Sequence, residues 1–201
     1  MAHKPGVWSE KALVTVTEEG GSDVAYQAMT SSIRITEGGK DIDQVAFLDG
    51  SRGVVKKPAG MIEISFEGYP TDVDVAGGTG VAIHYDSETT RDTVEPFKAT
   101  ATTRRDRYRV AIMWTDDETV SNAVNPALTT KNVMRYVLAN AYMTQHDHDY
   151  PSGDPLKVSF AFKAPAVDKS KTANRIIESI DGAATTAVLT TLGSYTSTVN
   201  W

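Results

Sequence analysis

Cysteine is absent from the 201-residue chain, so neither a disulfide framework nor a cysteine-bound zinc site can stabilise it. No apolar run approaches the ~18 residues of a membrane-spanning helix, and the N-terminal residues have no apolar stretch of the kind found in secretion signals. Bases are fewer than acids, 20 against 26, whereas proteins that grip nucleic acid neutralise its phosphates with lysine and arginine. We therefore expect a soluble protein, made in the cytoplasm, that neither enters membranes nor binds DNA tightly.

Catalytic signatures are also missing. The chain has no G-x-S-x-G motif and no thiol nucleophile. Its glycine-rich stretch at residues 77–80 lacks the lysine of a phosphate-binding loop. The alternating acids Asp72 and Asp74 are not followed by the further acids of an EF-hand. We predict that the protein is not an enzyme, and we assign it no catalytic or cofactor-binding residues.

The sequence HDHD at residues 146–149 is the feature most like a metal site. On a strand, His146 and His148 share one face, and two imidazoles at this spacing could begin a divalent-metal site. The other histidines, His3 and His84, stand at no recognised ligand spacing. We interpret the motif as the polar end of a hairpin and predict no metal ligands, with metal binding by the two histidines as the alternative.

Threonine and valine are frequent, and such β-branched residues favour strands. Apolar and polar residues alternate in short runs that end at turn residues, which predicts a mainly β protein. The expected strands span residues 11–17, 32–36, 44–53, 61–70, 81–85, 95–105, 106–117, 133–149 and 156–164. Asp49-Gly50 predicts a hairpin turn. A helix would also fit residues 133–149, but the turn-forming Tyr150–Pro155 favours a long hairpin with the following strand.

The strand at 106–117 has two different faces. We expect an apolar face with Tyr108, Val110, Ile112 and Trp114, and an opposite face with Arg107, Arg109, Ala111 and Met113. A basic cluster includes Arg104, Arg105, Arg107 and Arg109, and nearby acids balance it. We therefore predict a solvated hairpin corner or ion pairs between subunits, rather than a nucleic-acid surface.

One helix is expected at Glu118–Asn132, where small apolar residues recur at helical spacing and Pro126 can interrupt it. A further short segment is expected at residues 174–181. We predict a single domain over residues 1–201. It has an N-terminal arm at about 1–10, a long loop at about 71–92 and a C-terminal arm at about 183–201, all low in bulky side chains.

Two stretches resemble tail tube proteins of long-tailed viruses of bacteria and archaea. In the first, SIRITEGGKDIDQVAFLDG is followed by GVVKKPAGMIEISFEGYP, so one strand ends in a GGKDID turn and another in SFEGYP. In the second, a strand with the pattern Y-V-x-x-N-A precedes LKVSFAFKAPAVDKSKTANRIIESIDG. The resemblance extends from about Ser31 to Gly182, and it consists of strand order and turn sequences.

The resemblance implies a structural virion protein with a β-barrel or sandwich, a flanking helix, a long hairpin and extended arms. Its copies would form hexameric rings that stack into a hollow tail tube, and viral DNA would pass through this tube without tight binding. The partners would be the chain itself and other tail proteins at the tube ends. Residues 61–68 with a neighbouring strand, and the hairpin 133–149/156–164, would line the lumen. The arms and the loop 71–92 would join ring to ring.

Two alternatives stay open. A tail terminator, a decoration protein or a secretion tube would use similar β-rich subunits with arms. A metal-dependent enzyme or a ligand-binding β-barrel is suggested by HDHD and by the number of strands. The sequence is compatible with a bacterial or an archaeal host, and with a contractile or a non-contractile tail.

Overall fold

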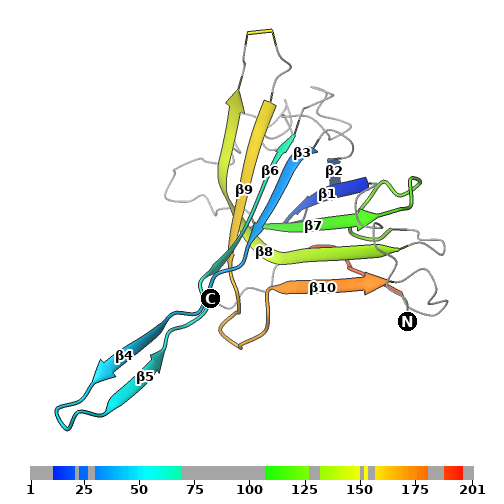
Figure 1. Ribbon diagram of the computed structural model, residues 1–201. Helices are drawn as coiled ribbons and strands as arrows, with labels where there is room; N and C mark the ends of the chain where they lie inside the picture. Colours follow the sequence, from blue (N-terminus) through cyan, green and yellow to red (C-terminus); the bar gives the residue numbers. More distant parts are fainter. Residues whose placement is uncertain are drawn as a thin grey trace.

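The computed structural model describes residues 11–20, 23–26, 30–68, 107–126, 132–149, 152–153, 157–180 and 188–196. Strands dominate these ranges (Figure 1). They are β1 (Lys11–Glu18), β2 (Asp23–Tyr26), β3 (Thr30–Thr36), β4 (Ile42–Ala46), β5 (Arg52–Lys56), β6 (Met61–Gly68), β7 (Arg107–Thr115), β8 (Val133–Asp149), β9 (Lys157–Pro165) and β10 (Arg175–Ile180). No helix in the described ranges has the length and apolar character that a membrane crossing requires.

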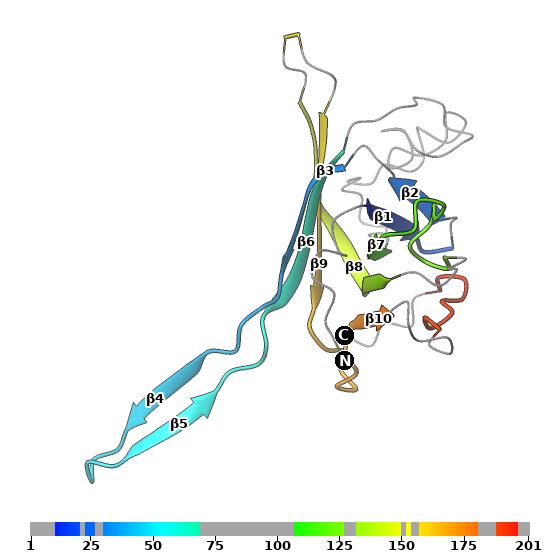
Figure 2. The ribbon, with the colours of Figure 1, turned by 45° about the vertical axis from the view of Figure 1, so that its right-hand side comes forward.

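Eight of the strands form one antiparallel sheet with the order β2-β1-β7-β8-β9-β6-β3, and β10 pairs with β8 beside this path. The 17-residue strand β8 changes partners along its length. Its first part, from Val133, lies between β7 and β10, and its last part, from Tyr142, pairs with β9. The sheet consequently folds over, with β3, β6 and β9 running steeply across the direction of β1, β7 and β10 (Figures 1 and 2).

The main core lies between the two parts of the folded sheet. Residues from β1, β6, β7, β8 and β9 fill it, including Val14, Ile64, Ile112, Leu138 and Phe162. The rings of Phe66 and Phe160 stack with centroids 5.0 Å apart. Apolar side chains alternate with polar ones along β6, because successive side chains of a strand point to opposite faces and only one face is buried.

A second core covers the other face of β1, β7 and the first part of β8. Leu13, Met113 and Val137 contribute from the strands, and residues 120–124 and Leu189 cover them. The strand β7 is therefore buried on both faces. This explains why its apolar residues are nearly continuous, as in strands that have a layer on each side.

Most of the strand predictions are confirmed. Strands occur within the expected ranges 11–17, 32–36, 61–70, 106–117, 133–149 and 156–164. The range 44–53, expected as one strand, contains the end of β4, a turn and the start of β5. Of the two predicted faces of β7, Tyr108, Val110 and Ile112 lie in the main core, with Trp114 packed at its margin, and Ala111 and Met113 lie in the second core. The segment expected at 174–181 is strand β10. The strands expected at 81–85 and 95–105, the arm at 1–10 and the loop at 71–92 lie outside the described residues.

The predicted flanking helix is wrong for the described part of Glu118–Asn132, which contains turns and bends. The Asn122 side chain accepts a hydrogen bond from the Val124 N–H at 2.7 Å, which a helix would pair with the carbonyl four residues earlier. Such a local bond competes with helical pairing. The Asp117 carboxylate accepts hydrogen bonds from the Thr119 N–H at 3.0 Å and the Thr119 hydroxyl at 2.6 Å, but this arrangement could equally cap the start of a helix.

The predicted barrel is also wrong for the described part of the chain, where the strands do not close into a barrel. The strands β2 and β3 stand at opposite ends of the path and do not pair with each other.

The strands β4 and β5 form a separate two-stranded sheet. We call residues 42–56 the arm, which is distinct from the N-terminal and C-terminal arms expected from the sequence. It extends away from the folded sheet (Figures 1 and 2), and the rest of the described chain is called the body.

Candidate assembly surfaces

The arm ends in the Asp49-Gly50 turn that the sequence predicts. Gly50 has a φ of 80°, in the left-handed region that favours glycine. The Asp49 carboxylate accepts hydrogen bonds from the Ser51 N–H at 2.9 Å and the Ser51 hydroxyl at 2.6 Å. Both bonds stabilise the charged carboxylate and so lower the pKa of Asp49 below its usual value. The bond from the hydroxyl has the larger effect. The tip is thus an ordered turn with a defined shape.

Large apolar side chains lie exposed along the arm. Leu48 at the tip is fully exposed, and Phe47 beside it is 53% exposed. Cross-strand pairing places Val45 opposite Gly53, and Asp43 opposite Val55, so these residues share one face. The Phe47 ring packs over Gly53, where a Cβ would lie 2.7 Å from a ring carbon. Exposed apolar surface of this kind marks a site of interaction.

The outer face of the part of the sheet formed by β3, β6, β9 and the end of β8 is polar. We call it the polar face. Ion pairs cross it, from Lys157 to Glu67 at 2.5 Å and from Lys163 to Glu63 at 3.0 Å. Strand register adds Arg34 from β3, and Asp147 and Asp149 from β8, to the same face. The polar face therefore carries four acids and three bases. The acids are Glu63, Glu67, Asp147 and Asp149, and the bases are Arg34, Lys157 and Lys163.

Both sides of the polar face end in an open strand edge. Among the described residues, β3 pairs only with β6. On β8, pairing with β7 ends at Tyr142, so residues 143–149 have a strand partner on the β9 side alone within the described ranges. Open edges present backbone N–H and C=O groups that a strand of another chain can pair with. The strands β2 and β10 also have only one strand partner each among the described strands.

The HDHD residues lie at the far end of the β8–β9 hairpin, as predicted. Residues 146 and 148 stand opposite Phe160 and Val158 in β9. No group of three or more histidine and acidic side chains is gathered as a metal site in the part of the chain that the structure describes. Metal binding by the two histidines stays an untested alternative.

Two arginines of the basic cluster are used within the subunit. Arg109 is buried, donates a hydrogen bond to the Gly193 carbonyl at 2.8 Å and pairs with Asp23 at 3.4 Å. The Arg107 guanidinium donates to the Tyr142 hydroxyl at 3.2 Å. These contacts differ from the predicted solvated corner or inter-subunit pairing, whereas Arg104 and Arg105 lie outside the described residues.

Residues 188–196, which fall in the predicted C-terminal arm, pack on the body of their own subunit. Leu189 and Tyr195 are buried, and the Tyr195 hydroxyl donates to the Asn140 side chain at 3.2 Å. Asn125 exchanges two hydrogen bonds with the Leu192 backbone, at 2.6 and 2.8 Å. Burial, with the nearby charge of Glu19, raises the pKa of Tyr195, so its phenol stays protonated.

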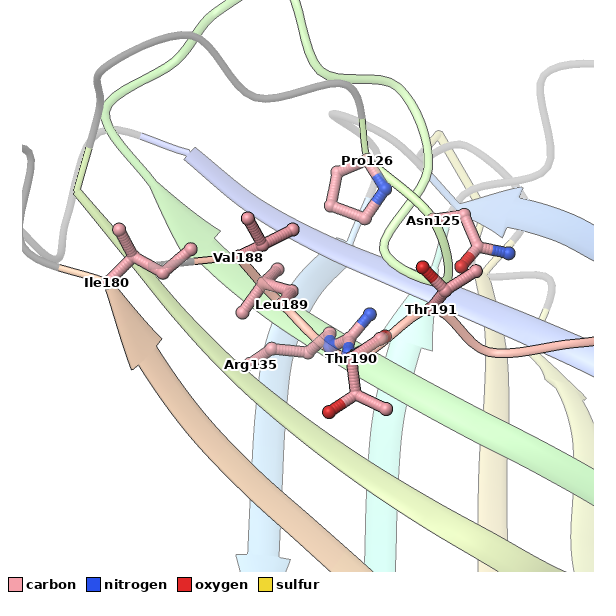
Figure 3. Close-up of a pocket in the computed structure, with 8 residues that line it drawn as sticks. All are labelled: Asn125, Pro126, Arg135, Ile180, Val188, Leu189, Thr190 and Thr191. Carbon is pink, nitrogen blue, oxygen red and sulfur yellow. The ribbon is translucent and has the colours of Figure 1, made fainter. Parts of the chain in front are cut away.

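Arg135 on β8 holds residues 188–196 against the body. Its side chain is fully buried; it donates to the Val124 carbonyl at 2.5 Å and the Thr190 carbonyl at 2.6 Å, and it forms an ion pair with Glu178. A cavity of about 210 Å³ lies above it (Figure 3). In this view the guanidinium lies next to Thr190 and below Leu189. Because the guanidinium is already engaged by the protein, the cavity offers a ligand little polar recognition.

Sequence reasoning missed the second strand of the arm and the packing of residues 188–196. The run GVVKK before Pro58 was the available signal for β5, because Val54 and Val55 follow a hairpin turn. The signal for the C-terminal segment was weaker. Leu189, Leu192 and Tyr195 recur every three residues among small polar ones, and the pairing of Asn125 with Leu192 has no sequence pattern.

No family model matches the chain, and no curated protein matches it in sequence. Solved structures with the same fold exist. The cap that terminates the tube of the anti-feeding prophage has a TM-score of 0.50 and 10% identity, over 90% of this chain and 95% of that one. The sheath/tube terminator of the extracellular contractile injection system PVC, in its extended state, has a TM-score of 0.52 and 10% identity, over 88% of this chain and 99% of that one. The chain thus shares its fold with these two structural proteins over nearly its whole length.

Proposed function

We propose that the protein is a structural, non-enzymatic subunit of a phage-like tail or injection machine, and that its copies join into rings that stack as a hollow tube. The proposal is based on the polar face, which has an open strand edge on each side. The shared fold with two tube-terminating proteins supports it.

The two open edges have the geometry that ring closure needs. The strands β3, β6, β9 and β8 are successively antiparallel, so β3 and the end of β8 run in opposite directions. When copies are related by rotation about a common axis, β3 of one copy meets residues 143–149 of the next as an antiparallel pair. A ring of copies therefore closes the sheet and removes these edges. We infer six copies from the resemblance to tail tube proteins.

In such a ring the polar face lines the lumen, because the opposite face is the main core. Its acids and bases nearly balance and form cross-strand pairs. In a lumen wall of this kind acids offset most of the bases, so little positive charge remains to neutralise the phosphates of DNA. Viral DNA would therefore pass along it without tight binding.

The arm then connects one ring to the next. Its exposed Phe47, Leu48 and Val55 require cover, and the arm reaches well beyond the body (Figure 2). We therefore assign the contacts between stacked rings mainly to the arm. The resemblance to tail tube proteins had instead implied the two terminal arms and the loop 71–92. The finished subunit would reside in the tail of the particle, after synthesis in the host cytoplasm.

A tube terminator is the second candidate. The two solved structures described above carry that designation. A terminator would form a single ring and would need a tube of another protein to receive it. The same open edges and arm would serve it, so only the length of the assembly separates the two functions.

Electron microscopy of purified protein at increasing concentration tests the proposal. We expect rings, and tubes at high concentration; single rings that do not elongate would instead indicate a terminator. Amide exchange supplies the second measurement, because β3 and residues 143–149 should become protected on assembly. A particle that stays monomeric at every concentration, with both edges already protected, would contradict ring formation. Metal content of the wild type and of a His146→Ala/His148→Ala variant tests the metal alternative.

A further inference from the structure

The arm is joined to the body by two short segments, residues 37–41 and 57–60, which we call the neck. Neither segment belongs to a strand. The Lys57 N–H donates to the Asp41 carbonyl at 2.9 Å, and the Gly60 N–H donates to the Gly39 carbonyl at 3.1 Å. The two chain passages therefore stay together across the neck with few backbone bonds.

Two glycines let the passages approach closely. A Cβ on Gly38 would lie 2.3 Å from the Gly60 carbonyl carbon, which is far inside van der Waals contact. Glycine also leaves the backbone more conformational freedom than any other residue. The neck is consequently thin where Gly38 and Gly60 meet.

Glu37, at the body end of the neck, is held by two strands of the body. Its carboxylate forms an ion pair with Arg175 at the start of β10 and accepts a hydrogen bond from the Tyr136 hydroxyl of β8 at 3.3 Å. Tyr136 is buried. Burial, with the charge of Glu37 adding to it, raises the pKa of Tyr136 to about 12, so the phenol remains a donor at physiological pH.

The body side of this contact is rigid. Arg175 pairs with Leu138 across β10 and β8, and the preceding Asn174 is buried and donates its side-chain amide to the Pro165 carbonyl at 2.7 Å. The Ala139 N–H also donates to the Asn174 carbonyl at 2.7 Å. Glu37 therefore connects a thin, glycine-containing neck to a fixed point.

We propose that the neck is a hinge and that Glu37, through Arg175 and Tyr136, sets the direction in which the arm points. The ion pair is about two-fifths exposed on both sides, and exposed pairs contribute little to stability. It can therefore open without unfolding the body. The hinge is a property of the single subunit and does not depend on ring formation.

Distance measurement between two spin labels tests the hinge. Because the chain lacks cysteine, Leu48→Cys at the arm tip and Ser179→Cys on β10 can be labelled selectively. Dilution with unlabelled protein restricts the signal to one subunit. We expect a single narrow distance distribution, which Glu37→Gln broadens and the exchange Glu37→Arg/Arg175→Glu narrows again.

The matched control is Glu63→Gln, which removes the similarly exposed Glu63–Lys163 ion pair of the body, 3.0 Å long, and should leave the distribution narrow. Gly38→Ala, which forces the neck apart, should shift the mean distance while the near-ultraviolet circular dichroism of the body is retained. A broad distribution in the wild type, or one that Glu37→Gln leaves unchanged, would overturn the proposal.

Discussion

Replacing Arg135 by methionine should destabilise the body strongly. The guanidinium is fully buried and serves three acceptors, namely the Val124 and Thr190 carbonyls and the Glu178 carboxylate. Methionine is similarly long but donates no hydrogen bond, so it fills much of the space and leaves the acceptors without their partner.

The size of the loss follows from these acceptors. A buried polar group left unsatisfied costs about 1–3 kcal/mol, and removal of one partner from a buried ion pair costs about 3–5 kcal/mol. Glu178 keeps some contact with water, with its side chain 19% exposed, and it can recover part of its hydration. We therefore expect the free energy of unfolding to fall by about 3–5 kcal/mol rather than by the sum of all the lost contacts.

Urea unfolding of wild type and variant measures this difference, provided that the slope of free energy against urea is unchanged. Arg34→Met is the matched control, because Arg34 is exposed on β3, and its effect should stay within about 0.5 kcal/mol. Adding Glu178→Gln in a double-mutant cycle should reveal a coupling energy of about 0.5–3 kcal/mol. A loss below about 1 kcal/mol for Arg135→Met would refute this account of Arg135.

Three further outcomes are expected. Phe162→Ala, which empties a fully buried site in the main core, should cost about 3–5 kcal/mol in the same assay. Leu48→Asp should change the stability of the isolated subunit by less than about 0.5 kcal/mol, because Leu48 is fully exposed, yet it should prevent stacking in electron micrographs. Glu178→Gln should be destabilising at neutral pH. Burial raises the pKa of Glu178, but hydrogen bonds from Thr190 and Arg135 outweigh it and leave that pKa below its usual value, so the stabilisation contributed by the carboxylate should disappear as pH falls through the lowered pKa.

The strands were predictable because apolar and polar residues alternate wherever one face of a strand is buried and the other is exposed. Ile62, Ile64 and Phe66 are buried, whereas Glu63 and Ser65 between them are only partly so, and this contrast is local in sequence. The Asp49-Gly50 turn was predictable for a similar reason, since the positive φ of Gly50 is a requirement of the turn itself.

The helix at Glu118–Asn132 failed as a prediction because helical spacing of small apolar residues does not exclude other structures. Val120, Ala123 and Val124 are buried as that spacing suggests, but the Val124 N–H bonds to the Asn122 side chain and not to a helical carbonyl. The closed barrel failed as a prediction because alternation shows which face of a strand is buried, but not which strands become neighbours; β10, for example, pairs with the first part of β8 although the two are distant in sequence.

The candidate surfaces were less predictable than the fold. Alternation in the 61–68 and 156–164 strands indicated a polar face, but the pairing of Glu67 with Lys157 depends on register between strands about 90 residues apart. The exposure of Val54 and Val55 could not be inferred, because two apolar residues beside a turn usually indicate burial.

The arm leaves the body at one end only (Figures 1 and 2). Copies that join by placing this hairpin on the next copy in line form a column whose two extremities differ. One extremity presents unused hairpins, and the other presents receiving surfaces that nothing occupies. Such a column lengthens by heterologous contacts that never close on themselves, so its final length must be fixed by a different molecule that covers one extremity.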